Sequence, residues 1–208
     1  MPGWGDALNT AQLDISLRDF LDSLFAAVEP ALDGDGARRV FSGTREACAD
    51  VSVREERKGV RVPVCSWFDE AAGRPGAPDD RLHGVTEGLK AIEPHLSWFC
   101  REDGTGTGSA NFPDGHGNAL IVGPGGMAEH ANVYVGASLL APDVRYPDHT
   151  HPPEELYLVL SDGAFRNAET EWRRPGAGGL FHNPPGIVHA MRSGDGPLLA
   201  IWMLVPAA

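Results

Sequence analysis

The part of the chain after residue 117 carries short apolar runs at close intervals, and this feature constrains the fold more than any other. Glycine, proline and short polar stretches separate the runs. Short strands with such punctuation are typical of a β barrel or sandwich. We predict strands at 120–122, 133–140, 156–160, 179–181, 188–191 and 198–205.

The preceding part of the chain has a different pattern. Between residues 14 and 32, apolar side chains recur at three- and four-residue spacing, which predicts an amphipathic helix. Shorter helices are expected at 37–49 and 82–99, and Pro94 should kink or end the second of these. Alternating valines within 51–68 indicate an extended segment or strand.

These patterns predict one main core in a mainly β protein. Residues 111–208 are expected to form a barrel that carries the functional site. Residues 1–110 are expected to form a mostly helical segment that packs on this barrel. The stretch 71–80, rich in glycine, proline and aspartate, should be an exposed loop, and 103–117, rich in glycine, serine, asparagine and aspartate, should be a linker or surface loop.

Charge and composition exclude several classes of partner. The formal net charge is −12, which would repel a phosphate backbone, so nucleic acid is not an expected partner. No stretch reaches the roughly 20 apolar residues of a membrane span, and the first residues lack the basic flank and apolar core of a signal peptide. We therefore expect a cytoplasmic protein that does not bind membranes. Cys48, Cys65 and Cys100 are expected to be free thiols.

Side chains that bind metal ions are concentrated between residues 146 and 157. Alternate residues of a strand face the same side, so His149 and His151 can present two imidazoles to one ion. Glu155 and Tyr157 share the odd parity of these histidines and are expected to face the same barrel interior.

A further candidate ligand lies downstream. In the spacing Gly178-x5-Pro184-x-Gly186-x2-His189, the glycines and proline predict a tight turn that leads into a strand carrying His189. Three imidazoles and one carboxylate form a mixed nitrogen and oxygen site. Such a site suits a divalent transition metal such as Zn, Fe, Mn, Co or Ni, and the sequence does not choose among them. Coordination positions would remain open for a substrate, as in catalytic sites.

Together the two elements resemble the paired metal-binding motifs of the cupin superfamily. The region from about Leu120 to Val205 is similar to the cupin-type dimethylsulfoniopropionate lyases in particular. Two positions depart from the common cupin pattern, since Ser193 replaces a frequent asparagine and Gly163 lies one residue late. The similarity rests on the run Y-P-x-H-x-H-P-x-E-E-x-Y from Tyr146 to Tyr157, the element P-x-G-x2-H-A ending at Ala190, and the segment 192–200.

This resemblance implies a fold, a ligand set and a reaction. The fold is the double-stranded β-helix, or jelly-roll barrel, with helices before it. The implied reaction is a β-elimination that splits dimethylsulfoniopropionate, a small carboxylate, into dimethyl sulfide and acrylate. Tyr146 and Tyr157 would lie near the metal and supply the base, although some members use a tyrosine as a ligand. Cupins often pair, so a homodimer is expected. The implied metal ligands are His149, His151, Glu155 and His189.

Other functions use the same ligand set. A cupin dioxygenase, a sugar isomerase or a cupin that binds a small ligand without turnover would fit the metal site equally well. The two tyrosines favour the lyase, because the other functions have no evident need for a phenolic base. Aromatic faces for a sulfonium cation could come from Trp202 or Tyr134, neither of which is assigned to the site. Histidines outside the motifs receive no role, namely His83, His95, His116, His130 and His182.

Overall fold

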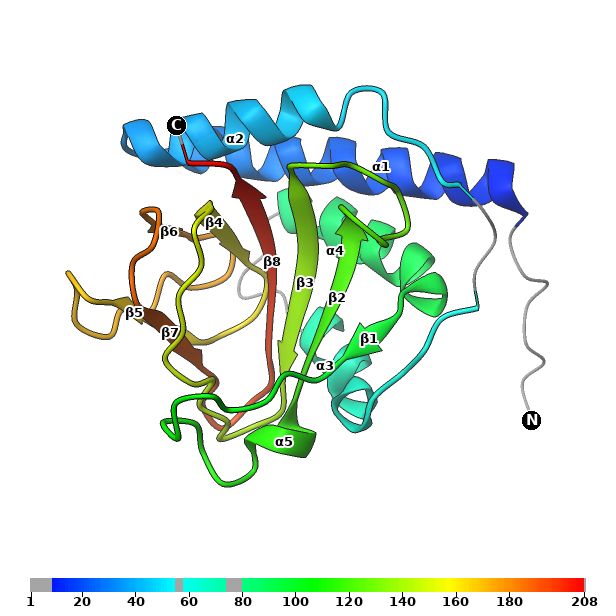
Figure 1. Cartoon of the computed structure of the whole chain (residues 1–208). Helices are drawn as coiled ribbons and strands as arrows, with labels where there is room; N and C mark the ends of the chain where they lie inside the picture. The colour runs from blue at the N-terminus through cyan, green and yellow to red at the C-terminus, as the bar shows by residue number, and fades with distance from the viewer. Residues whose placement is uncertain (1–8, 55–57, 74–79, 208) are drawn as a thin grey trace, which may run out of the picture.

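A computed structural model describes residues 9–54, 58–73 and 80–207 of the chain (Figure 1). Helices pack against one face of a large antiparallel sheet. A smaller sheet lies near the edge of the large sheet that carries β4 (Glu154–Val159) and β6 (Leu180–Asn183). Among the described residues, no helix combines the length and the apolar character needed to cross a bilayer.

Three of the helices follow the predicted periodicity. Helix α1 spans Thr10–Val28 and begins earlier than expected, because Asn9 caps it by accepting a hydrogen bond from the backbone of Gln12 at 3.0 Å. Helices α2 (Asp35–Ala47) and α4 (Asp80–Ile92) match the other two predicted helices. Helix α4 ends before Pro94 as predicted, and Pro94 lies in the short 3-10 turn η3 (Glu93–His95) that follows. The further 3-10 turn η1 covers Glu29–Ala31.

The segment 51–68, expected to be extended or a strand, forms no strand in its described residues, 51–54 and 58–68, and its last part is helical. Val60 makes only an isolated bridge to Ser97, and a helical turn follows. Pro63 begins this 3-10 turn, η2 (Pro63–Trp67), because its fixed φ suits the first helical positions. The chain then continues as helix α3. That helix, Phe68–Gly73, also replaces the first residues of the loop expected at 71–80, and the part of this loop at 74–79 lies outside the described residues.

The loop expected at 103–117 is irregular over most of its length, but its last residues form a short helix and the start of a strand. Helix α5 (Phe112–Gly115) forms near its end, and strand β2 (His116–Val122) begins directly afterwards. Strand β5 (Ala164–Asn167) had no counterpart among the predicted strands, and the short strand β1 (Trp98–Phe99) lies within the segment expected to be helical. The remaining six strands overlap the predicted ones.

Eight antiparallel strands build the sheets of the described chain. The order in the larger sheet is β1-β2-β3-β8-β4-β6, and β5 pairs with β7 in the smaller sheet. The predicted architecture, a cupin-type β barrel preceded by helices, is confirmed. The strands are β1 (Trp98–Phe99), β2 (His116–Val122), β3 (Tyr134–Leu140), β4 (Glu154–Val159), β5 (Ala164–Asn167), β6 (Leu180–Asn183), β7 (His189–Arg192) and β8 (Leu198–Val205).

The two faces of the large sheet have different roles. On β4, Leu156 and Leu158 face outward and join the helices in the larger apolar core. Tyr157, between them, faces inward and belongs to a smaller apolar cluster inside the barrel. Strand β1 pairs with β2, and the larger core includes residues on both sides of position 110. The division of the chain at that position stays a prediction. The helices therefore stabilise the outer face and leave the inner face for the site.

Candidate metal centre

Backbone pairing brings the two sequence motifs together. His149 and His189 form an antiparallel bridge in which each backbone N–H donates to the other residue's carbonyl, at 3.0 and 2.9 Å. Residues paired in this way project their side chains to the same face. Their imidazole ring centres are 4.1 Å apart. Histidines 40 positions apart in the sequence thus become direct neighbours.

The H-x-H element does not lie on a continuous strand as expected. His149 forms an isolated bridge, and His151 lies in irregular backbone before β4. Prolines at 147, 152 and 153 lack the N–H groups that a strand ladder requires. The two imidazoles nevertheless turn toward one centre, and their ring centres are 6.1 Å apart.

Each imidazole is held by a hydrogen bond from Nδ1 to a backbone carbonyl. The acceptors are the carbonyls of Pro147, Pro153 and Ile187, at distances of 2.9 to 3.0 Å. Because Nδ1 must donate its proton to a carbonyl, the neutral ring carries a lone pair on Nε2. This arrangement is usual for histidines that bind metal ions through Nε2. Ligand atoms of three histidines lie within 4.8 Å of one another, namely His149, His151 and His189.

Glu155 completes the cluster from strand β4. Its Oε2 atom lies 3.1 Å from Nε2 of His189 and 3.5 Å from Nε2 of His151. Asn183, its direct cross-strand partner on β6, donates a hydrogen bond of 2.8 Å to the same oxygen. All four predicted ligands therefore lie together.

These contacts leave the two histidines short of a proton donor. Nε2 of His151 and Nε2 of His189 are buried and have no hydrogen-bond partner. Neutral imidazoles face the carboxylate with lone pairs, so acceptor meets acceptor unless a cation lies between them. A metal ion would satisfy both nitrogens and the carboxylate at once, so the residues present fit such an ion.

Burial and mutual charges shift the pKa values of the candidate ligands. Burial and the neighbouring charge of His189 lower the pKa of His149 to about 4, so its imidazole stays neutral at ordinary pH. Burial also acts against the charged form of His151, but the carboxylate of Glu155, which would accept a hydrogen bond from the protonated ring, raises its pKa. Burial opposes ionisation of Glu155, yet His151 and His189, when their rings are protonated, act in the opposite direction and keep its pKa below the ordinary value.

Two tyrosines border the cluster in different surroundings. Burial raises the pKa of Tyr146, but the positive charge of Arg101 and a hydrogen bond of 3.2 Å from the side chain of Asn118 act in the opposite direction. Burial raises the pKa of Tyr157 further, and the negative charge of Glu155 adds to this effect. Both phenols are buried, with 4% and 3% of their surface exposed. The neighbours of Tyr146 thus favour the phenolate more than those of Tyr157.

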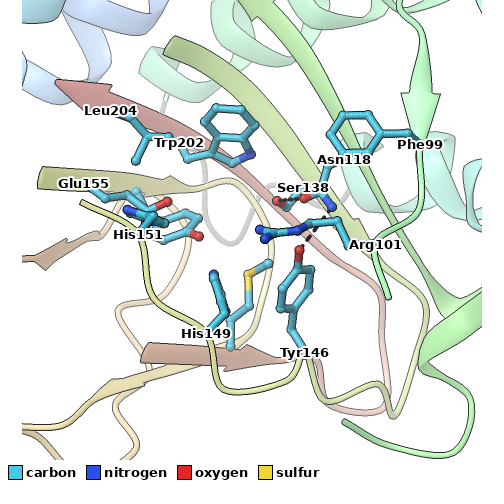
Figure 2. Close-up of a pocket in the computed structure, with 12 residues that line it drawn as sticks. Phe99, Arg101, Asn118, Ser138, Tyr146, His149, His151, Glu155, Trp202 and Leu204 are labelled. Carbon is cyan, nitrogen blue, oxygen red and sulfur yellow. Dashed lines mark hydrogen bonds and ion pairs between the residues drawn. The ribbon is translucent and has the colours of Figure 1, made fainter. Parts of the chain in front are cut away.

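A cavity of about 180 Å³ opens beside the candidate ligands (Figure 2). Trp202 contributes to its lining and is the cross-strand neighbour of Tyr157, whereas Tyr134 does not line it. Gly136 makes room for this indole, because a Cβ atom at that position would lie 2.2 Å from the ring. The cavity suits a small molecule with polar and apolar parts. Its lining comprises Phe99, Arg101, Asn118, Ser138, Tyr146, His149, His151, Glu155, Tyr157, Met191, Trp202 and Leu204.

Several residues of this cavity carry no sequence signal of their own. Ser138 donates to the side chain of Asn118 at 2.6 Å, and Asn118 in turn donates to the hydroxyl of Tyr146. Asn118 and Ser138 are cross-strand partners on β2 and β3, which a single sequence does not reveal. Arg101 lies just before the loop expected at 103–117. His116, given no role from the sequence, is fully buried next to this network.

Comparison with known proteins identifies the family. Residues 37–200 match the family described as dimethylsulfoniopropionate lyase. The chain belongs to the dimethylsulfoniopropionate lyase family. It is 30% identical over 143 residues to the dimethylsulfoniopropionate lyase DddQ of Ruegeria pomeroyi, which covers 68% of this chain and 69% of that protein.

Solved structures agree on the fold. The crystal structure of the dimethylsulfoniopropionate lyase DddQ from Ruegeria pomeroyi is similar with a TM-score of 0.73 at 20% identity, over 92% of each chain. A structure from the work on the lyases RdDddP and RnDddQII also has a TM-score of 0.73, at 22% identity over 94% of each chain. The family fold therefore includes the N-terminal helices as well as the barrel.

Proposed function

We propose that this protein is a metal-dependent lyase that cleaves dimethylsulfoniopropionate to dimethyl sulfide and acrylate. Membership of the lyase family supports the reaction. The observation that carries the proposal is the convergence of three Nε2 lone pairs and a carboxylate beside a cavity that also contains two phenols. A small carboxylate is the expected substrate, and a homodimer remains a prediction.

The proposed metal ligands are three histidines and a glutamate. Two buried nitrogens without a partner and the nearby carboxylate support this set. When bound, the metal would polarise the substrate carboxylate and so make the proton on the neighbouring carbon more acidic. Zn, Fe, Mn, Co and Ni all suit these donors. The ligands are His149, His151, Glu155 and His189.

Tyr146 is the better candidate for the base. Its oxygen accepts a hydrogen bond from Asn118, and the guanidinium of Arg101 lies close enough to interact with it. Both neighbours stabilise a negatively charged oxygen. Tyr157 interacts with the carboxylate of Glu155, which favours the neutral phenol. We assign Tyr157 the role of holding Glu155, with Tyr146 as the group that accepts the proton.

The proposed reaction is a β-elimination. Tyr146, as phenolate, removes a proton from the carbon next to the carboxylate, and the electron pair of that C–H bond forms the C=C bond of acrylate. The C–S bond breaks at the same time, and both of its electrons leave with dimethyl sulfide. Trp202 offers an aromatic face to the sulfonium group, an interaction of about 1 to 2 kcal/mol for a desolvated cation. The phenol regains its starting state by losing the proton to solvent.

The direct test measures dimethyl sulfide in the headspace over protein loaded with each candidate metal. Metal-dependent release supports the proposal, and its absence with every metal refutes it. Tyr146→Phe should lower kcat by about 10² to 10⁴-fold while the metal content stays unchanged. Tyr157→Phe is the matched control, because it removes the other phenol of the same cavity. A larger loss of kcat in Tyr157→Phe would reverse the assignment of the base.

A further inference from the structure

Arg101 carries a permanent positive charge into the cavity. Of the described residues that line this cavity, it is the one lysine or arginine, and Glu155 is the one acidic residue. Figure 2 shows the guanidinium directed toward the cavity interior, near the hydroxyl of Tyr146. The residue as a whole is exposed, but it lines the cavity, so its charge attracts an anion that enters.

The backbone of Arg101 is fixed by a buried histidine. Its N–H donates a hydrogen bond of 2.8 Å to Nε2 of His116, and Nδ1 of the same ring bonds to the carbonyl of Phe112. The ring of His116 also stacks on Phe112, with centroids 3.7 Å apart and planes 10° apart. Both ring nitrogens are therefore used, and the imidazole anchors the loop after β1 at the rim of the cavity.

The hydrogen-bonding capacity of Arg101 exceeds what the protein uses. A guanidinium has five N–H donors in a planar fork that matches a carboxylate. The described contacts of this side chain involve the hydroxyl of Tyr146. Across the described residues, the ion pairs between arginines and carboxylates do not include Arg101. Donors therefore remain for a ligand.

The charge also determines which end of a zwitterion can lie here. A sulfonium group would be repelled by the guanidinium, whereas a carboxylate would be attracted. Since the carbon that loses its proton is bonded to the carboxylate, a carboxylate held at Arg101 places this carbon beside Tyr146. A carboxylate has two oxygens and about four lone-pair sites, so contact with Arg101 does not compete with binding to a metal.

We propose that Arg101 binds the substrate carboxylate, and that it thereby sets both the preference for anionic substrates and the direction in which the substrate lies. The substrate direction rests on the proposed lyase function, but the preference for a carboxylate does not. This assignment makes Arg101 a binding and specificity residue, with His116 as the residue that positions its backbone.

The test compares two unreactive probes, propionate and propionamide, which differ in charge but little in shape. Calorimetry on zinc-loaded and on metal-free protein gives Kd for each probe. Arg101→Met should raise Kd for propionate by about 10- to 100-fold and leave propionamide almost unchanged. Arg101→Lys should lie between, because it keeps the charge but loses the planar fork.

Arg174→Met is the matched control. This substitution also removes one positive charge. The arginine is exposed, pairs with Asp162 on the surface and does not line the cavity, so propionate binding should not change. An equal effect of both substitutions on propionate would overturn the proposal, as would wild-type protein that does not prefer propionate to propionamide.

Turnover separates this inference from the proposed function. Release of dimethyl sulfide with an unchanged KM in Arg101→Met would overturn the role of Arg101 and leave the lyase standing. Propionate binding that depends on Arg101, in a protein that releases no dimethyl sulfide with any metal, would overturn the lyase and support the anion site. A raised KM together with weaker propionate binding supports both.

Discussion

Replacing Glu155 by glutamine is expected to stabilise the metal-free protein at alkaline pH and to weaken its metal binding. The carboxylate lies among two Nε2 lone pairs, at 3.1 and 3.5 Å, and 3% of the residue is exposed. Without a cation it is a buried charge whose donors are neutral groups. An amide of the same shape removes this charge and can donate to an imidazole nitrogen.

The size of the effect depends on pH through His151. Its pKa in the folded protein is raised above the ordinary value, so the charged pair with Glu155 stabilises the fold below about pH 6.5. This contribution is lost as the pH rises through the folded-state pKa. At pH 9, relief of the buried charge should stabilise Glu155→Gln by about 2 kcal/mol. Since 1 kcal/mol shifts Tm by about 2 to 4 °C in a chain of this size, Tm should rise by about 4 to 8 °C.

The assay is thermal unfolding of chelator-treated protein from pH 5.5 to 9, with metal affinity measured by competition. Tm of Glu155→Gln minus Tm of the wild type should change from negative to positive across this range. Loss of one charged ligand, worth about 3 kcal/mol or more at an effective dielectric constant near 20, should weaken metal binding by at least about 10²-fold.

Glu154→Gln provides the control on the same strand. Glu154 is equally buried but is fully paired, with Arg39 at 2.8 Å and His182 at 2.9 Å. Its replacement should destabilise the protein by about 1 to 3 kcal/mol with or without metal and leave metal affinity unchanged. The reasoning is refuted if Glu155→Gln lowers Tm of the metal-free protein at pH 9, or if both substitutions weaken metal binding equally.

Three further outcomes are expected. Gly136→Ala should destabilise the protein by about 1 to 3 kcal/mol in denaturant unfolding and raise KM, because the new Cβ would displace the indole of Trp202. His189→Ala should reduce bound metal measured by elemental analysis, and full metal content would count against the ligand set. Asp148→Asn should cost about 1 kcal/mol at pH 7, since this carboxylate pairs with two arginines that, against the effect of burial, lower its pKa. That cost should shrink as the pH falls below about 4, which a pH series of unfolding curves would detect.

Those parts of the site that depend on a few neighbouring residues could be predicted from the sequence. Spacing placed Glu155 and Tyr157 on one face of β4, and both line the cavity. Glycine and proline before His189 predicted the turn that leads into β7, where Gly186 has a φ of 69°. These features depend on a few consecutive residues, so spacing and turn chemistry were sufficient to predict them.

Other parts of the site depend on contacts that spacing does not encode. Strand β1 has two residues and depends on pairing with β2, and Arg101 follows it in a segment without periodicity. His116 belongs to no sequence motif, but its buried imidazole connects the loop at Arg101 to helix α5 through both ring nitrogens. Ser193, which departs from the cupin pattern, donates to the carbonyl of Ala141 at 2.6 Å and accepts from the backbone of Val144 at 2.9 Å. The backbone of Arg101 is 15 positions from His116, and the partners of Ser193 are 49 and 52 positions away, beyond the reach of local patterns.

Two adjacent glutamates show how the fold separates stability from function. Parity turns Glu154 outward to α2, where Arg39 and His182 complete its hydrogen bonds and attach the helix to the barrel. The alternation along the strand turns Glu155 inward, where Asn183 donates one hydrogen bond and the nearby imidazole nitrogens of His151 and His189 have lone pairs without a proton to donate. The protein would be more stable if Glu155 were paired as fully as Glu154, since a buried charge without a charged partner costs several kcal/mol. The missing positive charge at Glu155 is therefore the physical reason to expect a cation there. The change in Tm caused by Glu155→Gln, and its change of sign with pH, measures this effect directly.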